Sequence, residues 1–485
     1  MTECPTLRLA FAASEMTPLA KTGGLADVVA ALPASLARRG HEVKVFLPLY
    51  RRLREQGREF EPVVSRLRFD LGSRRVSGRL LELVPSPGPR VFCLDIPSLY
   101  DRDALYTGDA DEHLRWAAFS RGVLAACQET AWAPDVFHVH DWHLGLLPLQ
   151  HRLLSSWDRL LAQSRSILTI HNLGYQGTFS SEILNDIGLD DAAQHLHQEQ
   201  LSAGKIGYLT TGLLHAGLLS TVSETYAREI QEEAQGFGLH QLLRSRSDDL
   251  VGIVNGVDYS EWDPRIDSHL PTPYGPDTLV DKLETKRMLL SRLGLTPGDE
   301  APTFGIVARL VQQKGFELFF ETLPELLAHR DARLCVLGAG ESRYEKFFAG
   351  LQSEFRGKVC FYRGYHAGLA HLIEAGSDFF LMPSLYEPCG LNQMYSLRYG
   401  TVPIVRKTGG LADTVELYSP SSGEGNGIVF EHFDDNAVRW ALRQALEVYS
   451  DPEAWDRIRL NGMAADHSWD RRAVDYEALY QRVLA

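Results

Sequence analysis

Two cations, Arg309 and Lys314, stand close together in the segment Arg309-Leu-Val-Gln-Gln-Lys314. The segment follows an apolar run that reads as a strand and precedes an amphipathic helical pattern. Arginine offers a planar fork of N–H donors and lysine a compact charge, so the two could meet one diphosphate across a strand-to-helix turn. Two solvated surface cations that bind nothing are the plain alternative.

The heptapeptide KTGGLAD occurs twice, once as Lys21 to Asp27 and once as Lys407 to Asp413. Each copy follows a predicted strand and precedes a predicted helix, Val28 to Arg38 in the first case and Thr414 to Leu417 in the second. A glycine turn at a helix start presents unpaired backbone N–H groups, which suits an anion. Gly-Gly also serves simple tight turns, but an identical repeat favours a shared ligand.

A carboxylate, Glu387, stands in Tyr386-Glu-Pro-Cys-Gly-Leu-Asn-Gln393, between a buried strand and a helix. It could accept hydrogen bonds from sugar hydroxyls while backbone N–H groups at Gly390 and Leu391 donate to the same ligand. The alternative is a carboxylate that only complements the helix dipole. Cys389 could be a thiol activated by the helix start, although no partner histidine is visible, and packing or sugar contact is favoured.

The segment His138-Val-His-Asp-Trp-His143 invites a zinc interpretation. On a strand His138 and His140 would share a face, but His143 lies past the turn and no second cluster supplies a matching carboxylate. We therefore expect no metal, and polar ligand contacts by Asp141 and His143. His171 ends the next strand and opens the loop HNLGYQG on the same edge, where it is either a structural residue or a ligand contact.

Bulk properties restrict the partners. The 485 residues carry 49 Lys and Arg against 63 Asp and Glu, a formal charge of −14, which argues against nucleic acid or an anionic membrane surface as a partner. The six cysteines are widely spaced, without a C-x-x-C, and fit a reducing compartment. Met1 to Ala13 does not read as a signal peptide, and Ile206 to Ser223 is a poor membrane span. We therefore expect a cytoplasmic protein.

Near-continuous apolar strands alternate with amphipathic helices along the chain, which is typical of parallel sheets covered on both faces. The pattern restarts after the turn Asn255-Gly-Val-Asp258, so we expect two doubly wound domains, at 1–255 and 256–460, and a C-terminal helix at 461–485 that could return to the first. Ligands bind at the carboxyl ends of such strands. If those edges face each other, the ligand sits between the domains.

The blocks KTGGLADVVAALP, HDWH, HNLGYQG, TVSETYAREI, NGVD, ARLVQQKG and YEPCGLNQMYSLRYGTVPIVRKTGGLADTV occur in this order. Together they resemble the bacterial glycogen synthase and plant starch synthase family over about residues 8 to 440. The resemblance implies the GT-B fold, an α/β architecture of two Rossmann-like, doubly wound parallel-sheet domains facing across a cleft. It also implies transfer of glucose from ADP-glucose to the non-reducing end of an α-1,4-glucan such as glycogen, with retention of configuration and without a cofactor.

The resemblance also implies roles for individual residues. Arg309 and Lys314 resemble the family's diphosphate clamp, Glu387 a contact of the donor glucose, and His171 a residue beside the anomeric carbon. Further expected substrate contacts are Lys21, Gly23, Gly24, Asp27, Asp141, Asn172, Asn255, Tyr365 (against adenine), Cys389, Gly390, Leu391, Gly409 and Gly410. Arg51 to Arg90 and Asn185 to Gln200 match the family poorly, which leaves the acceptor side open. The sequence does not give the oligomeric state.

Three other interpretations remain. A related retaining transferase could use UDP-glucose or a small acceptor such as a sugar phosphate. A glucan-binding regulatory protein with an inactive site is a second, although it would gain little from a complete leaving-group clamp. A phosphorylase with pyridoxal phosphate shares the broad architecture, but its characteristic blocks are not apparent.

Overall fold

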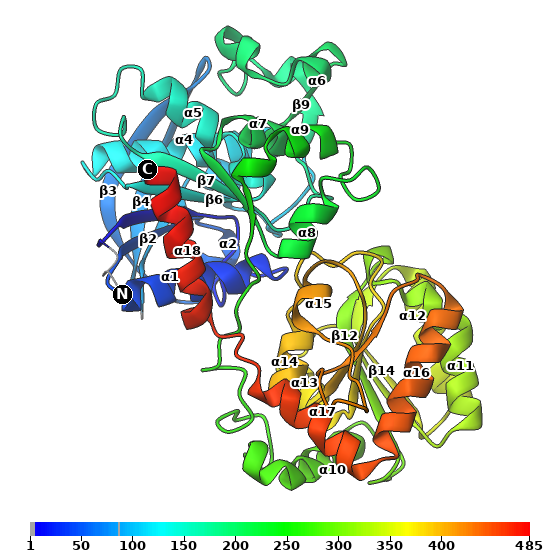
Figure 1. Ribbon diagram of the computed structural model, residues 1–485. Coiled ribbons are helices and arrows are strands. Elements are labelled where there is room, and N and C mark those ends of the chain that lie inside the picture. Colours follow the sequence, from blue (N-terminus) through cyan, green and yellow to red (C-terminus); the bar gives the residue numbers. More distant parts are fainter. Residues whose placement is uncertain (1–4, 86–87) are drawn as a thin grey trace. The chain divides into compact units, whose positions relative to one another are not determined.

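The computed structural model describes residues 5–85 and 88–485. Cys4, one of the six cysteines, lies outside them. The chain divides into two compact units (Figure 1). The first comprises the described residues of Met1–Val222, Ala227–Gly256 and Trp469–Ala485, and the second comprises Ser223–Tyr226 and Val257–Ser468. The predicted ranges differ from this division mainly at the chain's end, where the segment of the first unit begins at Trp469 instead of 461.

The sheet of the first unit has the strand order β11-β10-β7-β6-β1-β2-β5-β4-β3. Its strands are β1 (Arg8–Ala12), β2 (Glu42–Pro48), β3 (Glu59–Leu71), β4 (Arg74–Val84), β5 (Arg90–Asp95), β6 (Val136–His140), β7 (Arg165–Ile170), β10 (Leu218–Thr221) and β11 (Leu250–Gly252). A separate ribbon joins β8 (Thr178–Ser180) to β9 (Lys205–Gly207). The pairs from β11 to β5 are parallel, as expected.

The hairpin of β3 and β4 is an antiparallel extension that the sequence pattern did not reveal. Most side chains in the first half of β3 are at least partly exposed, so the strand carries no apolar run of the kind that marked the others. Charged residues on an exposed edge strand prevent it from pairing with other chains. The same residues interrupt the apolar pattern by which a strand is recognised in sequence.

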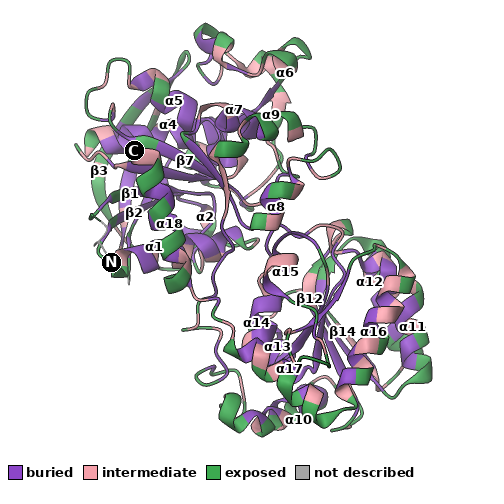
Figure 2. Cartoon of the chain, in the orientation of Figure 1, coloured by how far each residue is buried: buried purple, intermediate pink, exposed green. Residues whose placement is uncertain are grey.

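The helices of the first unit cover both faces of its sheet. They are α1 (Leu25–Arg38), α2 (Arg51–Glu55), α3 (Pro97–Tyr100), α4 (Glu112–Glu129), α5 (Leu147–Leu154), α6 (Gln198–Ser202), α7 (Tyr208–His215), α8 (Glu224–Glu229, shared with the second unit), α9 (His240–Ser245) and α18 (Trp469–Leu484). Figure 2 shows the central strands of the sheet buried, and exposed residues on the outer helix faces and along β3. Within the part of the chain that the structure describes, no helix is both long and apolar enough to cross a membrane.

The C-terminal helix α18 lies alongside α1 in the first unit (Figure 1). Arg39, at the end of α1, donates two hydrogen bonds of 2.6 and 2.7 Å to the two carboxylate oxygens of Glu477. His41 contacts the same carboxylate at 3.1 Å, and Tyr480 reaches His138 of β6 at 2.9 Å. The last helix is therefore held to the first unit by polar contacts as well as by packing.

The second unit has a wholly parallel sheet in the order β14-β13-β12-β15-β16-β17. Its strands are β12 (Thr303–Leu310), β13 (Arg333–Gly340), β14 (Val359–Arg363), β15 (Phe379–Met382), β16 (Val402–Arg406) and β17 (Ile428–Phe430). Its helices are α10 (Lys282–Arg292), α11 (Phe319–His329), α12 (Ser342–Glu354), α13 (Ala367–Gly376), α14 (Asn392–Arg398), α15 (Gly409–Thr414), α16 (Asp435–Tyr449) and α17 (Pro452–Ala464). The parallel sheet and its covering helices agree with the doubly wound domain expected for 256–460.

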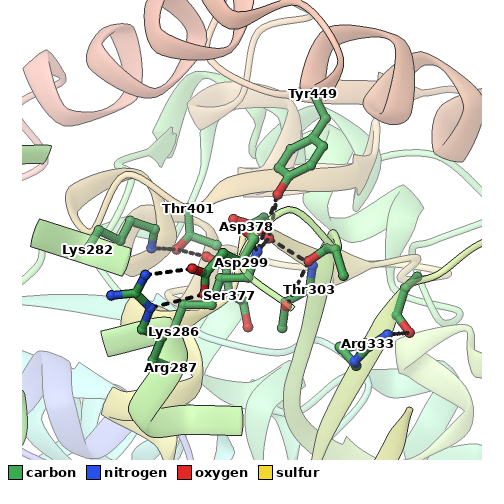
Figure 3. A network of polar contacts seen from close by, with 12 residues as sticks. Lys282, Lys286, Arg287, Asp299, Thr303, Arg333, Ser377, Asp378, Thr401 and Tyr449 are labelled. Carbon is green, nitrogen blue, oxygen red and sulfur yellow. Dashed lines mark hydrogen bonds and ion pairs between the residues drawn. The ribbon is translucent and has the colours of Figure 1, made fainter. Parts of the chain in front are cut away.

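A buried polar network lies at the amino-terminal ends of β12 and β15 (Figure 3). One oxygen of Asp378 accepts hydrogen bonds from Lys286 Nζ at 2.7 Å and from the backbone N–H of Thr303 at 2.8 Å. The neighbouring Lys282 donates to Thr401 Oγ1 at 2.7 Å, and its burial lowers the pKa of its ammonium group to about 7. Helix α10 is thereby attached to the sheet through buried polar contacts.

The two KTGGLAD copies differ in conformation. In the first, α1 begins at Leu25, after both glycines. In the second, α15 begins at the first glycine, Gly409, and ends at Thr414. The predicted helix from Thr414 to Leu417 is therefore wrong. The chain becomes extended there because the Asn426 side chain accepts the Glu416 N–H at 2.8 Å and Leu417 pairs with Gly427.

Candidate active site

In the second unit, the loops that carry the predicted residues follow neighbouring parallel strands. The segment with Arg309 and Lys314 closes β12, Glu387 follows β15, and Gly409 follows β16. These strands are adjacent in the order β12-β15-β16, so their carboxyl ends share one edge. Ligands of doubly wound sheets bind at such an edge.

Lys314 and Glu387 form the centre of this edge. Lys314 Nζ lies 2.6 Å from Glu387 Oε2, and Ser384 Oγ donates to the same oxygen at 2.9 Å. Glu387 is 5% exposed, whereas the Lys314 side chain keeps 20% of its surface. A charge-assisted pair of this kind positions the ammonium group and leaves it N–H donors for a ligand.

The two loops around this pair are fastened to each other. The Leu385 N–H donates to the Gln313 carbonyl at 2.9 Å. Gly315 adopts a left-handed conformation with φ +68°, and a Cβ there would lie 2.1 Å from the carbonyl oxygen of Pro383. Only glycine allows the Lys314 loop to come this close to the Glu387 loop.

Gly409 and Gly410 pack against the backbone of the Glu387 loop. A Cβ on Gly409 would lie 1.9 Å from the Glu387 carbonyl oxygen. The Gly410 N–H donates to the carbonyls of Glu387 at 3.1 Å and Pro388 at 3.2 Å. That N–H is therefore bonded inside the protein, whereas the sequence analysis expected these glycines to contact phosphate. What the structure shows of these glycines is support of the Glu387 loop.

Arg309 differs from Lys314 in its surroundings. It is exposed at the end of β12, and within the described residues its guanidinium makes no hydrogen bond or ion pair. Lys407, the cation of the second KTGGLAD copy, is instead paired at 2.7 Å with the exposed Glu431. Tyr365 is 76% exposed after β14, which lies two strands from β12. The guanidinium N–H groups of Arg309 are thus available to a ligand. Tyr365 follows a strand that is not adjacent to the strand carrying the Lys314 loop.

The turn after Glu387 is shaped by a side chain that the sequence analysis did not single out. Gln393 Nε2 donates to the carbonyls of Cys389 at 3.0 Å and Gly390 at 3.1 Å. Gly390 has φ +75°, the Cys389 side chain is buried, and Leu391 caps α14. In the sequence, this role was indicated by the position of Gln393 in the first turn of α14, directly after the loop that it holds.

In the first unit, β6 and β7 are neighbours and place Asp141 beside His171. Asp141 has φ +56°, and its Oδ1 accepts the His171 backbone N–H at 2.7 Å. His171 Nε2 lies 3.0 Å from Nδ1 of His140. Burial lowers the pKa of His171 to about 3, so the imidazole is neutral at neutral pH. Asn172 lies next in the loop, where its Oδ1 accepts the Gly174 N–H at 3.0 Å.

The carboxyl group of Asp141 has a raised pKa. Burial raises the pKa of its carboxyl group to about 7, against the opposing effect of backbone N–H donors from His171 and Asn172. Asp141 as a whole is only partly buried, but the desolvation of its carboxyl group is the main cause of the raised pKa.

A pH dependence follows from this shift. The folded state holds the Asp141 proton between pH 3.8 and about 7, where the unfolded state has lost it. The contribution of Asp141 to stability is therefore present below that window and is lost as the pH rises through it. We expect Asp141→Asn, whose amide oxygen can still accept the N–H groups, to exceed the wild type in thermal midpoint by more at about pH 8 than at about pH 5. A gap that is equal at both pH values, or larger at the lower one, would contradict the assignment.

The first KTGGLAD turn does bind an anion, but one supplied by the protein. The buried carboxylate of Glu15 accepts the Thr22 hydroxyl at 2.6 Å and the Gly23 N–H at 3.2 Å. The Gly23 N–H therefore already has an acceptor inside the protein, whereas the sequence analysis expected it to contact the substrate. Glu15 was missed, although its place just past β1 was a signal. Lys21 Nζ pairs with Asp27 at 2.6 Å. Gly24 caps α1 and is exposed.

Asn255 lies at the end of the first unit and is 4% exposed. Its Oδ1 is buried without a hydrogen-bond partner among the described residues. An unsatisfied buried amide oxygen costs free energy and is therefore a candidate acceptor for a ligand or a water molecule.

The histidines of HVHDWH do not gather as metal ligands. His138 and His140 share a face, as expected, and their rings stack 4.4 Å apart. His143 instead packs between Tyr106, Trp116 and Trp142. Among residues 5–85 and 88–485, the group close enough to hold a metal ion is Asp267, His269 and His371, with ligand atoms within 4.8 Å. Asp267 already accepts His371 Nδ1 at 2.8 Å and the Tyr399 hydroxyl at 2.6 Å.

Two family models and full-length relatives match this chain. The starch synthase catalytic domain family matches residues 8–245, and the group 1 glycosyl transferases match residues 294–459. A glycogen synthase of Myxococcus xanthus (strain DK1622) is 46% identical over 99% of this chain and 100% of its own. A glycogen synthase of Koribacter versatilis (strain Ellin345) is 42% identical over 98% of each chain.

A solved structure also matches the whole chain. It is the catalytic domain of Starch Synthase IV from Arabidopsis thaliana bound to ADP and acarbose, with a TM-score of 0.90, 32% identity and 99% coverage of both chains. The expected GT-B fold with two Rossmann-like units is confirmed. With matching relatives over its full length and a basic and acidic pair at the strand ends, this chain belongs to the glycogen synthase and starch synthase family of glycosyltransferases.

Proposed function

We propose that this protein is a glycogen synthase that transfers glucose from ADP-glucose to the non-reducing end of an α-1,4-glucan with retention of configuration. The observation that carries the proposal is the pair of Lys314 and Glu387 at the strand edge, with the exposed Arg309 at the end of β12. Full-length similarity to glycogen synthases supports the reaction, and the ADP and acarbose bound by the plant starch synthase support the two substrate classes.

The cations serve the leaving group in this proposal. As the bond from the anomeric carbon to the diphosphate breaks, negative charge grows on the leaving oxygen. Lys314 and Arg309 stabilise that charge, which is the largest kind of electrostatic term in enzyme catalysis. Glu387 holds Lys314 in place and can accept a hydroxyl hydrogen bond from the donor glucose.

The retained configuration follows from the direction of attack. A double displacement would need a carboxylate nucleophile close to the anomeric carbon. We assign to that position the neutral His171, so we infer that the glucan hydroxyl attacks from the face that the diphosphate leaves. The new carbon–oxygen bond forms as the old one breaks, and the leaving phosphate oxygen takes the hydroxyl proton. The protein then acts mainly by positioning both substrates.

The remaining contacts are part of the same proposal. Lys21, Gly24, Asp27, Asp141 and Asn255 would serve the substrates from the first unit. Asn172 would join them, and Tyr365, Cys389, Gly390 and Leu391 would serve the donor from the second unit. Action in the cytoplasm stays a prediction from the sequence.

Nucleotide release tests the proposal. The protein is incubated with ADP-glucose or UDP-glucose, each with and without glycogen, and the released nucleoside diphosphate is measured. We expect release that depends on glycogen and is faster with ADP-glucose. Faster release from UDP-glucose would mean that UDP-glucose is the donor. In a further incubation with a sugar phosphate in place of glycogen, release that glycogen does not support would mean that the sugar phosphate is the acceptor. No release under any condition would reject a transferase.

A further inference from the structure

Three histidines form a stacked and hydrogen-bonded array in the first unit. His138 is held from both sides, by the Tyr480 hydroxyl at 2.9 Å from its Nδ1 and by Thr169 Oγ1 at 2.6 Å from its Nε2. His140 stacks on His138 with ring centres 4.4 Å apart, and the Phe11 ring lies 5.7 Å from it. His140 is fully buried and cannot change its ring position without disturbing these neighbours.

The bond from His140 to His171 needs one proton between the two rings. Nδ1 of His140 and Nε2 of His171 are 3.0 Å apart, so one of them carries hydrogen and the other accepts it. Burial lowers the pKa of both rings, which leaves each neutral with a single N–H. Either His140 donates through Nδ1, or His171 donates through Nε2.

The other nitrogen of His140 decides between these arrangements. Its Nε2 is buried and has no hydrogen-bond partner in the described part of the chain. If His171 were the donor, the His140 proton would sit on Nε2 as a buried N–H without an acceptor. Orphaned buried N–H groups are rarer in proteins than acceptors that lack a donor. His140 is therefore the donor, and its bare Nε2 is the unpaired atom.

The consequence falls on His171. Its Nε2 accepts from His140, so its own proton sits on Nδ1. Within the described residues Nδ1 of His171 makes no hydrogen bond, and the residue keeps part of its surface. An N–H without a partner on this partly exposed residue can donate to an oxygen of a bound substrate.

We propose that His140 is a positioning residue that fixes His171 as the Nδ1–H tautomer, so that His171 offers a hydrogen-bond donor to an oxygen of the nucleotide sugar. The tautomer rests on the hydrogen bonds and the burial of the array and does not depend on the reaction. The substrate contact rests on the proposed function. His138 contributes by holding the ring on which His140 stacks.

Nitrogen NMR tests the tautomer directly. The full-length protein is labelled with ¹⁵N-histidine, and the His171 signals are identified by their loss in His171→Asn. We expect a protonated Nδ1 and a bare Nε2 in the wild type, and a mixture of tautomers in His140→Phe, which removes the donor and keeps a ring. A proton on Nε2 in the wild type, or an unchanged His171 tautomer in His140→Phe, would overturn the proposal.

Kinetics tests whether the tautomer matters. We expect His140→Phe to lower kcat/KM for ADP-glucose by about tenfold to a hundredfold, the usual effect of losing one hydrogen bond to a substrate that carries charge. His140→Asn, whose amide N–H can replace Nδ1–H, should restore most of the rate. The matched control is His151→Phe, because His151 is also buried and contacts Phe137 of β6, but within the described residues its ring bonds to Leu161 and Ser155 and to neither His140 nor His171.

The outcomes separate the two claims. Equal losses in His140→Phe, His140→Asn and His151→Phe would show a packing effect and overturn the positioning role. A wild type without ADP-glucose activity would reject the proposed function and leave the NMR result to stand by itself.

Discussion

Lys314→Ala is expected to lower kcat with ADP-glucose and glycogen by roughly a hundredfold to a thousandfold, the cost of removing one preorganised donor from a developing oxyanion. The lysine is held 2.6 Å from Glu387, so its ammonium group needs little rearrangement when charge appears on the leaving diphosphate. Initial rates of ADP release at saturating glycogen measure the effect. Lys346→Ala, which removes an exposed lysine of α12 in the same unit, serves as the control and should keep the wild-type rate.

A double substitution separates catalysis from folding. Lys314→Met leaves the buried Glu387 carboxylate without its cation, which by itself can lower the thermal midpoint. Adding Glu387→Gln neutralises that carboxylate. We expect the double variant to regain thermal stability but not turnover. Recovery of turnover would mean that Lys314 only balances the charge of Glu387, and the leaving-group role would be wrong.

The second large effect concerns stability. Lys286→Met is expected to lower the free energy of unfolding of the second unit by about 3–5 kcal/mol, the usual cost of removing one partner of a buried ion pair. The side chains of Lys286 and Asp378 keep only 4% and 10% of their surface. The substitution leaves the Asp378 carboxylate buried, with the Thr303 N–H among its remaining donors. Denaturant unfolding, together with hydrogen exchange of β12 and β15, measures the loss in this unit.

The neighbouring residue provides a matched control. Arg287 lies next on α10 and pairs with Asp299 and Glu284 at 2.6 Å, but all three side chains are about half exposed. Exposed pairs contribute little, so Arg287→Met should leave the stability nearly unchanged. Lys286→Met combined with Asp378→Asn should recover part of the loss. Equal effects at 286 and 287 would show that burial does not set the cost.

Much of this molecule could be inferred from its sequence because the information is local. Apolar runs of strand length, separated by amphipathic helices, predicted the parallel strands of both sheets. Motifs such as ARLVQQKG and YEPCGLNQ stand directly after such runs, so their place at a sheet edge followed from the chain itself. The β3–β4 hairpin escaped because its exposed, charged strands lack that pattern.

Other features depended on contacts between distant residues. The identical KTGGLAD segments begin their helices at different glycines, because the second copy packs on the Glu387 loop and the first is bound by Glu15. The sequence predicted anion-binding turns but could not show that Glu15 fills one and that Gly410 is bonded internally.

The sequence by itself determined which residue types stand at the ends of the strands, and these types predicted the fold class and led to the proposed diphosphate chemistry. Only the tertiary structure decided that Lys314 pairs with Glu387, that Asp141 and His171 share a site, and that His140 bonds to His171. The physical reason is that hydrogen bonds and desolvation act over a few ångströms in space. The separations that determine them are set by strand order and loop packing and not by distance along the chain.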